Sequence, residues 1–136
     1  MSINEIQDKI IEEFSSLEDG FEKYMHIVDL GKSLKPINKE YKTEEYLISG
    51  CQSEVWLRGE MKENKIYFSA DSNASITKGI IALLLRVLNE QSPEDIINNK
   101  LYFIDRIGLS SNLSPARGNG LYSVLESIKS FAEKNI

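Results

Sequence analysis

The sequence has few of the residues that build metal centres and disulfide frameworks. Its 136 residues include one cysteine and one histidine. A single cysteine excludes an internal disulfide framework, and it cannot supply a multi-cysteine metal site or an iron–sulfur cluster. We therefore expect this chain to hold no metal and no cofactor of its own.

Long apolar runs are also missing. The most apolar stretch, residues 80–85, stops at Arg86 and is far too short to cross a bilayer. The first residues do not have the basic and apolar regions of a secretory signal. We expect a cytoplasmic protein that does not enter a membrane.

The net charge of −5 is unevenly distributed. Residues 1–50 hold 11 acidic and 6 basic side chains, whereas residues 51–136 hold 10 of each. An acidic first third argues against nucleic-acid binding, which needs a basic surface. It fits either plain solubility or a partner with a basic face.

Composition and periodicity predict one α+β domain over residues 1–136, because 41% hydrophobic and 27% charged residues are usual for a globular chain. Two helices are expected before the sheet, from the capping box Ser2–Glu5 to Leu17 and from Phe21 to Gly31. Four are expected after it: over residues 76–88, from Pro93, over residues 101–107, and from Ser114–Pro115 onward. Their apolar stripes include Ile3, Ile6, Ile10 and Phe14 in the first helix, and Phe21, Tyr24, Met25 and Val28 in the second. Gly79, inside the most apolar helix, predicts close approach by another backbone.

Alternating residues predict a hairpin between the helices. Val55, Leu57 and Met61 alternate with polar positions, and Ile66, Phe68 and Ala70 repeat the pattern after a turn around Asn64. Residues 46–48 are a possible third strand. Helices that flank a small antiparallel sheet indicate the α+β class.

Cys51 is the first candidate for chemistry. It lies in Ser49-Gly50-Cys51-Gln52-Ser53, a polar, glycine-bearing loop between two predicted strands. A thiol is nucleophilic only as its thiolate, so Cys51 needs a lowered pKa or a base. The one histidine, His26, is a candidate base for a hydrolase-type pair. An ordinary half-buried thiol remains the alternative.

Two further clusters stand out by their position in the sequence. Arg117 and Asn119 fall at the start of the last helix, where free N–H groups favour anions; the alternative is a surface arginine paired with an acid. The segment from Asp71 to Ala74 is most simply a helix cap before Ile76. The more specific alternative is that it binds a partner protein. Trp56 on the polar strand face either anchors an interface or packs beneath a terminal helix.

Four blocks of the chain, in order, resemble the SufE family of sulfur acceptors for cysteine desulfurases. Residues 50–56, GCQSEVW, resemble the signature GCQSxVW, and residues 24–32 end in the triplet LGK. Residues 71–85 are similar to DSxAxIxKGxIAxLL, and residues 113–121 resemble LSPxRxNGL. The chain departs from the family at Asn73, where an acidic residue is common, and at Lys23, where an arginine is frequent.

The resemblance implies a fold with a three-stranded antiparallel sheet packed on helices, similar to the IscU-type scaffold. It implies that Cys51 takes sulfur as a persulfide from a pyridoxal-phosphate-dependent cysteine desulfurase of the SufS type and passes it to an iron–sulfur scaffold of the SufB type. The protein would then be an accessory without turnover of its own. The binding positions implied are Gly50, Gln52, Ser53, Asp71, Arg117 and Asn119.

Two other functions remain open at this point. The first is a stand-alone cysteine hydrolase that uses Cys51 and His26. The second is a pure interaction domain in which Cys51 has no chemical role.

Overall fold

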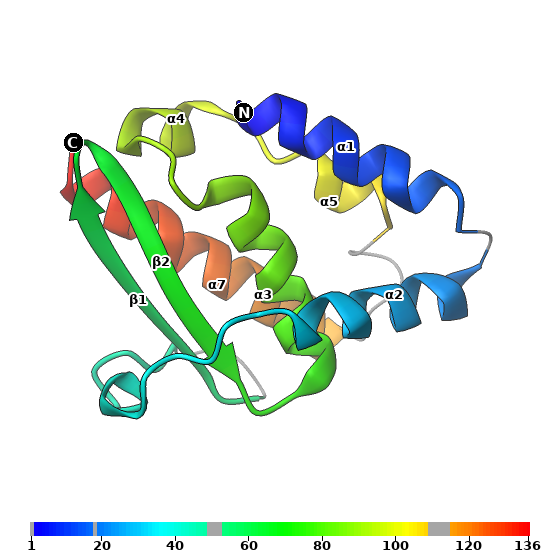
Figure 1. Cartoon of the computed structure of the whole chain (residues 1–136), viewed down its shortest axis with the longest axis horizontal. Coiled ribbons are helices and arrows are strands. Elements are labelled where there is room, and N and C mark those ends of the chain that lie inside the picture. The colour runs from blue at the N-terminus through cyan, green and yellow to red at the C-terminus, as the bar shows by residue number, and fades with distance from the viewer. Residues whose placement is uncertain (1, 18, 49–52, 109–114) are drawn as a thin grey trace.

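The fold is described from a computed structural model that covers residues 2–17, 19–48, 53–108 and 115–136, with the backbone alone for residues 115–120. Figure 1 shows a narrow hairpin at one side and helices across the rest of the molecule. In chain order the elements are α1 (Ile3–Ser15), α2 (Gly20–Lys32), the 3-10 turn η1 (Lys39–Tyr41), β1 (Val55–Lys62), β2 (Lys65–Ser72), α3 (Ser75–Leu88), α4 (Pro93–Asn98), α5 (Phe103–Arg106) and α7 (Pro115–Lys134). None of the described helices combines the length and apolar character that crossing a membrane requires.

The two strands pair antiparallel, from Val55 opposite Ser72 to Lys62 opposite Lys65. The turn between them has two residues, Glu63 and Asn64, with φ of 51° and 68°. Positive φ at both positions is what a type I′ hairpin turn needs, and its twist matches that of the strands. The expected turn around Asn64 is therefore confirmed.

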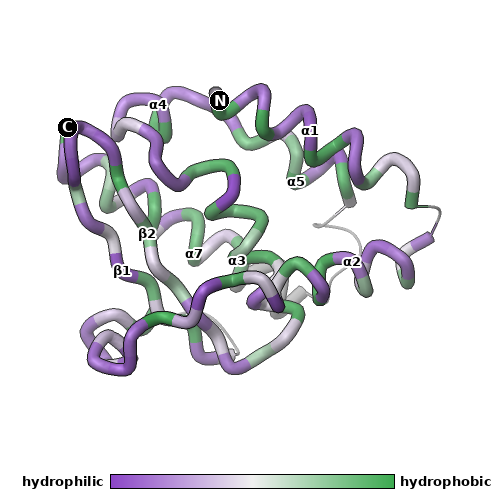
Figure 2. Tube along the Cα trace, viewed as in Figure 1, coloured by the Kyte–Doolittle hydropathy of each residue, from purple (hydrophilic) through white to green (hydrophobic). Residues whose placement is uncertain are grey.

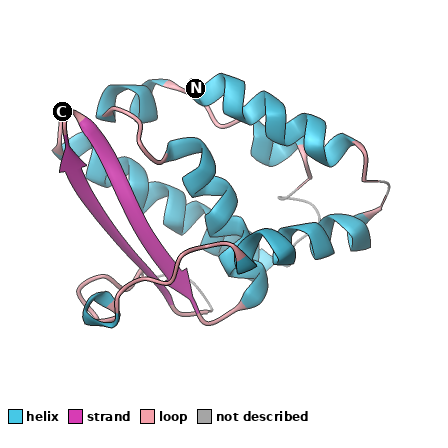
Figure 3. Cartoon of the chain, in the orientation of Figure 1, coloured by secondary structure: helices cyan, strands magenta, loops and turns pink. Residues whose placement is uncertain are grey.

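The α+β class is confirmed, and Figure 3 shows helices behind one face of the hairpin. The third strand is shorter than expected, because residues 46–48 form only an isolated bridge to β1. The Ile48 N–H donates to the Val55 carbonyl at 2.8 Å, and the Leu57 N–H donates to the Tyr46 carbonyl at 2.9 Å. Two hydrogen bonds join this segment to β1 without making it a full strand of the sheet.

The core forms where α3 and α7 cross the inner face of the sheet. Residues 80–88 of α3 are buried except for Ala82 and Arg86, and Figure 2 shows this helix as a largely hydrophobic band. The Phe131 ring of α7 covers Gly59 of β1 so closely that a Cβ at Gly59 would lie 2.8 Å from it. The hairpin is therefore held by apolar burial on one face.

The first helix follows its sequence pattern closely. Ser2 and Glu5 form the expected capping box, in which each side chain bonds the other residue's backbone N–H. Ile3, Ile10 and Phe14 are buried. The prediction for α1 is confirmed from its cap to its apolar face.

The side of α2 that faces the core is not the one that carries most of its predicted apolar stripe. We call Phe21, Tyr24, Met25 and Val28 the α2 stripe. Phe21 is 73% exposed, Tyr24 38% and Met25 43%. The helix is held instead by Ile27 and Gly31, which lie against Gly79 of α3. Close contact between two backbones orients α2, so Phe21, Tyr24 and Met25 of its predicted apolar stripe face outward and Val28 packs against the core.

Candidate functional site

The loop around Cys51 can be located from its two ends. Ser49, Gly50, Cys51 and Gln52 lie outside the described residues, whereas Ile48 and Ser53 are described. We call residues 49–53 the cysteine loop. It begins directly after Ile48, whose N–H donates to the Val55 carbonyl, and ends two residues before the buried start of β1. The sheet therefore fixes where the cysteine loop leaves and re-enters the fold.

Asn73 ties the outgoing end of the cysteine loop to the end of β2. Its N–H donates to the Glu54 carbonyl at 3.3 Å, and its Oδ1 accepts from the Glu54 N–H at 3.1 Å. Its Nδ2 also donates to the Glu54 carboxylate at 3.4 Å. The side chain makes its two bonds because an amide both accepts and donates. The residue that departs from the family pattern is thus a polar tie at the base of the cysteine loop.

Asp71 lies next to this tie and is almost completely buried, with 4% of its surface exposed. Its carboxylate accepts from the Ser72 N–H at 2.8 Å and lies 3.1 Å from Lys42 Nζ and 3.5 Å from Lys78 Nζ. Burial acts to raise the pKa of Asp71, but the Ser72 N–H and the two lysines outweigh it and hold the pKa below its ordinary value. Asp71 therefore joins β2, α3 and the segment before β1 as a charged group.

The interpretation of residues 71–74 as a side-chain cap for the next helix was wrong. Helix α3 begins after Ala74, which makes no side-chain cap. The Ser72 hydroxyl accepts from the Ala74 N–H at 3.2 Å, ahead of the helix, while Asp71 and Asn73 bond elsewhere. The lysines and the glutamate that bond these two side chains come from other segments, so local spacing gave no sign of them.

Sequence reasoning also missed a cationic and aromatic layer over the outer face of β1. Lys42 lies 5.4 Å from the centre of the Trp56 ring, and Arg58 lies 4.3 Å from that of Tyr41. Tyr41 meets Tyr46 edge to face at 5.5 Å. Trp56 therefore packs beneath the segment around η1 and not beneath a terminal helix. The alternation of β1 placed Trp56 on the outer face, but it did not identify what covers it.

Two hollows lie beside the sheet. One, of about 270 Å³, lies between residues 45–48, the inner sheet face and α7, and begins at Ile48 beside the cysteine loop. A larger one, of about 500 Å³, lies between the end of α2, β2 and α3. Of the two, the smaller is continuous with the described flank of the cysteine loop.

For Arg117 and Asn119, the structure confirms the predicted start of the last helix but describes only their backbone. Helix α7 begins at Pro115, where the sequence predicted a helix start. Arg117 and Asn119 fall in its first two turns, and their side chains lie outside the described residues. Their binding role stays a prediction.

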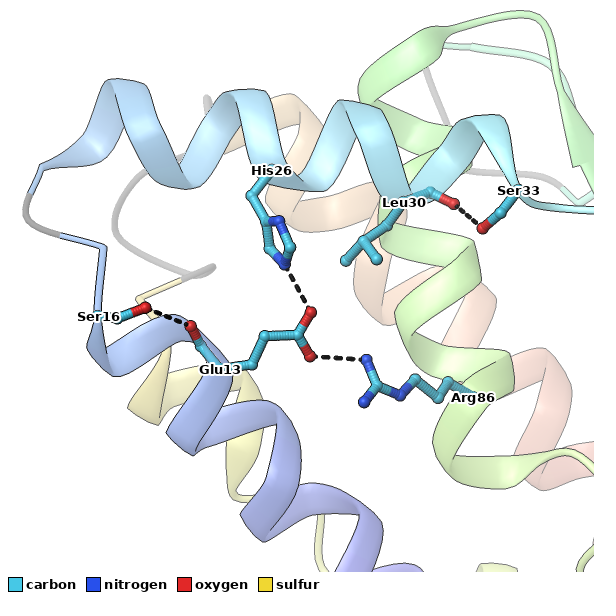
Figure 4. A network of polar contacts seen from close by, with 6 residues as sticks. All are labelled: Glu13, Ser16, His26, Leu30, Ser33 and Arg86. Carbon is cyan, nitrogen blue, oxygen red and sulfur yellow. Dashed lines mark hydrogen bonds and ion pairs between the residues drawn. The ribbon is translucent and has the colours of Figure 1, made fainter.

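His26 lies at a three-helix junction, shown in Figure 4. Its Nε2 is 2.8 Å from Glu13 Oε1, and Arg86 donates to Glu13 Oε2 at 2.8 Å. Burial acts to raise the pKa of Glu13, but its bonds to Arg86 and His26 lower it overall. The histidine ring also meets Phe14 edge to face at 5.0 Å. These contacts give His26 a structural partner in α1, and the pairing with Cys51 stays a prediction.

Within the described ranges, no group of three or more histidine, cysteine or acidic side chains is arranged to hold a metal ion. The polar groups near the cysteine loop pair with each other or with lysine. What the described residues offer chemically is a sheet end with a buried carboxylate, Asp71, that pairs with Lys42 and Lys78 close to where the cysteine loop joins β1.

Comparisons with known proteins agree on the family and the fold. The SufE family, described as an Fe-S metabolism associated domain, matches residues 8–132. An uncharacterized SufE-like protein of Synechocystis sp. is 32% identical over 124 residues, which are 91% of this chain and 78% of that protein. The fold is similar to the solution structure of a hypothetical protein from Thermus thermophilus, with a TM-score of 0.77 and 20% identity over 95% of this chain and 94% of that one.

Proposed function

This chain belongs to the SufE family, which gives it a role in Fe–S metabolism, and on that premise we propose that it accepts sulfur from a cysteine desulfurase. Residues 1–136 act as one domain that carries the sulfur as a persulfide on Cys51. The donor is a pyridoxal-phosphate enzyme of the SufS type, and the recipient is an iron–sulfur scaffold of the SufB type. The protein acts as an accessory in the cytoplasm and has no turnover of its own.

The transfer is a nucleophilic displacement at sulfur. The Cys51 thiolate attacks the outer sulfur of the desulfurase persulfide, a new S–S bond forms at Cys51, and the S–S bond to the desulfurase breaks. The desulfurase cysteine leaves as its thiolate and takes up a proton. Because one sulfur atom moves between two thiols, no external oxidant or reductant is consumed, and one cysteine in the acceptor is sufficient.

The observation that carries the proposal is the place of the single cysteine. Both described ends of the cysteine loop are tied to the sheet, at Ile48 and at Glu54, so the frame can present a short loop to another protein. Gly50 adds backbone freedom, and Gln52 and Ser53 flank the thiol with polar groups. We assign Asp71 to holding the frame beside the cysteine loop, and Arg117 and Asn119 to docking or transfer.

Intact-mass measurement after mixing with a SufS-type desulfurase and L-cysteine tests this function. We expect a gain of about 32 Da, one sulfur atom on the Cys51 thiolate, together with faster alanine production by the desulfurase. Cys51→Ser should abolish both effects and leave the melting temperature unchanged within about 1 °C, because we expect a residue in a polar loop to contribute little to stability.

A matched variant separates this function from the hydrolase alternative. His26→Gln removes the only candidate base but leaves Cys51, so the mass gain should persist. A wild-type protein that gains no mass and does not stimulate the desulfurase would contradict sulfur transfer. Hydrolysis of an ester or amide without any partner, lost in His26→Gln, would favour the hydrolase.

A further inference from the structure

Three of the four side chains of the α2 stripe, Phe21, Tyr24 and Met25, are left exposed by the fold, whereas Val28 is half-buried against the core. Phe21, Tyr24, Met25 and Val28 recur at steps of three and four residues, so they line one side of α2. Phe21 is the most exposed of the large hydrophobic side chains in the described residues, at 73%. His26 and Leu30 extend instead toward α1 and α3, as Figure 4 shows. An exposed apolar stripe with helical spacing is typical of a helix that docks into a groove of another protein.

The charges beside the α2 stripe restrict what can cover it. Glu22 and Asp29 lie along its outer edge, and Asp19 caps the start of the helix. Lys32 ends the stripe and pairs with Asp29 at 3.4 Å, so these two charges offset each other and the acidic excess beside the stripe comes from Asp19 and Glu22. Complementary charge across an interface favours a partner whose groove is bordered by lysine and arginine.

The same charges disfavour two other occupants. Antiparallel pairing of two copies would place Glu22 of one α2 along the same edge as Asp29 of the other, where like charges repel. An anionic membrane surface selects helices with lysine and arginine on the polar face, rather than acidic ones. A protein with a basic-bordered groove remains the best fit.

The position of α2 connects the stripe to the cysteine loop. Helix α2 crosses α3 at Gly79, one turn after α3 begins at Ser75. Asn73, which ties the cysteine loop, precedes Ser75 by two residues. The crossing therefore lies within roughly 15 Å of the base of the cysteine loop, and Phe21, six residues before Ile27, lies roughly 9 Å further along α2. A standard interface of about 800 Å² per partner is roughly 30 Å across, so one partner can cover both features.

We propose that the α2 stripe is a docking surface for the cysteine desulfurase, which presents an apolar groove bordered by basic side chains. This inference rests on the proposed function. The α2 stripe supplies affinity, whereas the cysteine loop supplies the reacting thiol. Loss of the stripe should therefore weaken binding without removing the chemistry.

The test uses the whole chain, a purified SufS-type desulfurase, and a double variant, Phe21→Ser with Met25→Ser. We expect its Kd, measured by titration calorimetry, to rise about tenfold or more, because exposed aromatic and methionine side chains are frequent interface anchors. At saturating desulfurase the mass gain on Cys51 should remain. Ile136→Ser is the matched control, since Ile136 is 72% exposed and lies at the opposite end of the molecule from α2 (Figure 1). That variant should bind as the wild type does.

A charge variant gives a second measurement that does not depend on the apolar side chains. Asp29→Lys should slow association several-fold at low salt, with a smaller effect at high salt, because steering by charge is screened. An unchanged Kd in the double variant, with mass gain in the wild type, would overturn this inference alone. If the wild type neither binds nor gains mass, the proposed function fails and this inference fails with it.

Two further outcomes would assign the stripe to another occupant and overturn the proposal. The first is a wild-type dimer in analytical ultracentrifugation that becomes a monomer in the double variant. The second is sedimentation of the wild type with phosphatidylserine vesicles that the double variant loses. We expect a monomer that stays in the supernatant for both proteins.

Discussion

Gly79→Ala tests the crossing that orients α2. A Cβ at this position would fall on the Ile27 carbonyl oxygen and 2.6 Å from the carbonyl carbon. Ordinary contacts of a Cβ begin at 3.4 Å, so the two helices must move apart by at least about 0.8 Å. The obstacle is backbone, which cannot rotate away as the end of a long side chain can.

The magnitude follows from two opposing effects. Alanine is favoured over glycine inside a helix by about 1 kcal/mol. Overpacking of a tight contact costs about 1–3 kcal/mol, and contact with backbone points to the upper end of that range. We expect a net destabilisation of about 2 kcal/mol, which corresponds to a fall in Tm of roughly 6 °C for a domain of this size.

Thermal unfolding followed by circular dichroism measures this effect. Gly20→Ala is the control, because Gly20 is the exposed first residue of α2; its Tm should stay equal or rise slightly. If Gly79→Ala raised the Tm or left it unchanged, the helices would not approach as closely as described, and the account of why the α2 stripe faces outward would be refuted.

The polar groups near the cysteine loop give two more predictions. Asn73→Asp should destabilise the fold by about 0.5 kcal/mol at neutral pH, because the variant loses the amide donor and places a second carboxylate beside that of Glu54. Adding Glu54→Gln should restore the Tm. If the Tm were not restored, the hydrogen bonds between Asn73 and Glu54 would not hold the base of the cysteine loop. Asp71→Asn should cost about 1–2 kcal/mol at pH 7, because Lys42 and Lys78 lose their buried partner. The folded pKa of Asp71 lies below its ordinary value of 3.8, so this contribution is present above that pH and disappears as the pH falls through the folded value. Urea unfolding at about pH 7 and about pH 3 should show a larger difference at the higher pH; an equal difference at both would contradict the charged role.

Local patterns predicted the elements well because their causes are local. The Ser2 cap, the alternation of Val55 with Trp56, and the turn at Asn64 depend on neighbours a few residues away. Gly79 correctly indicated close approach, because a glycine costs stability inside a buried helix unless a neighbouring segment needs the space. These features needed no knowledge of the rest of the fold.

The features that were missed depend on distant partners. Phe21 and its neighbours have the spacing of a core face, yet the contact of Gly31 with Gly79 turns them outward. Asp71 has the spacing of a cap, yet its carboxylate pairs with Lys42 and Lys78. Periodicity shows that side chains share a face, but it does not show which segment of the chain meets that face.

The tied base of the cysteine loop also sets how far its thiol can travel. Cys51 is two residues from Ser53, and consecutive Cα atoms are about 3.8 Å apart, so its Cα stays within roughly 7 Å of that residue along any path. This short connection excludes a mechanism in which Cys51 moves a long distance between two partner proteins. Under the proposed function, the sulfur donor and the recipient must each bring the reacting atom to the edge of the hairpin, so the fit between the two proteins sets the accuracy of transfer.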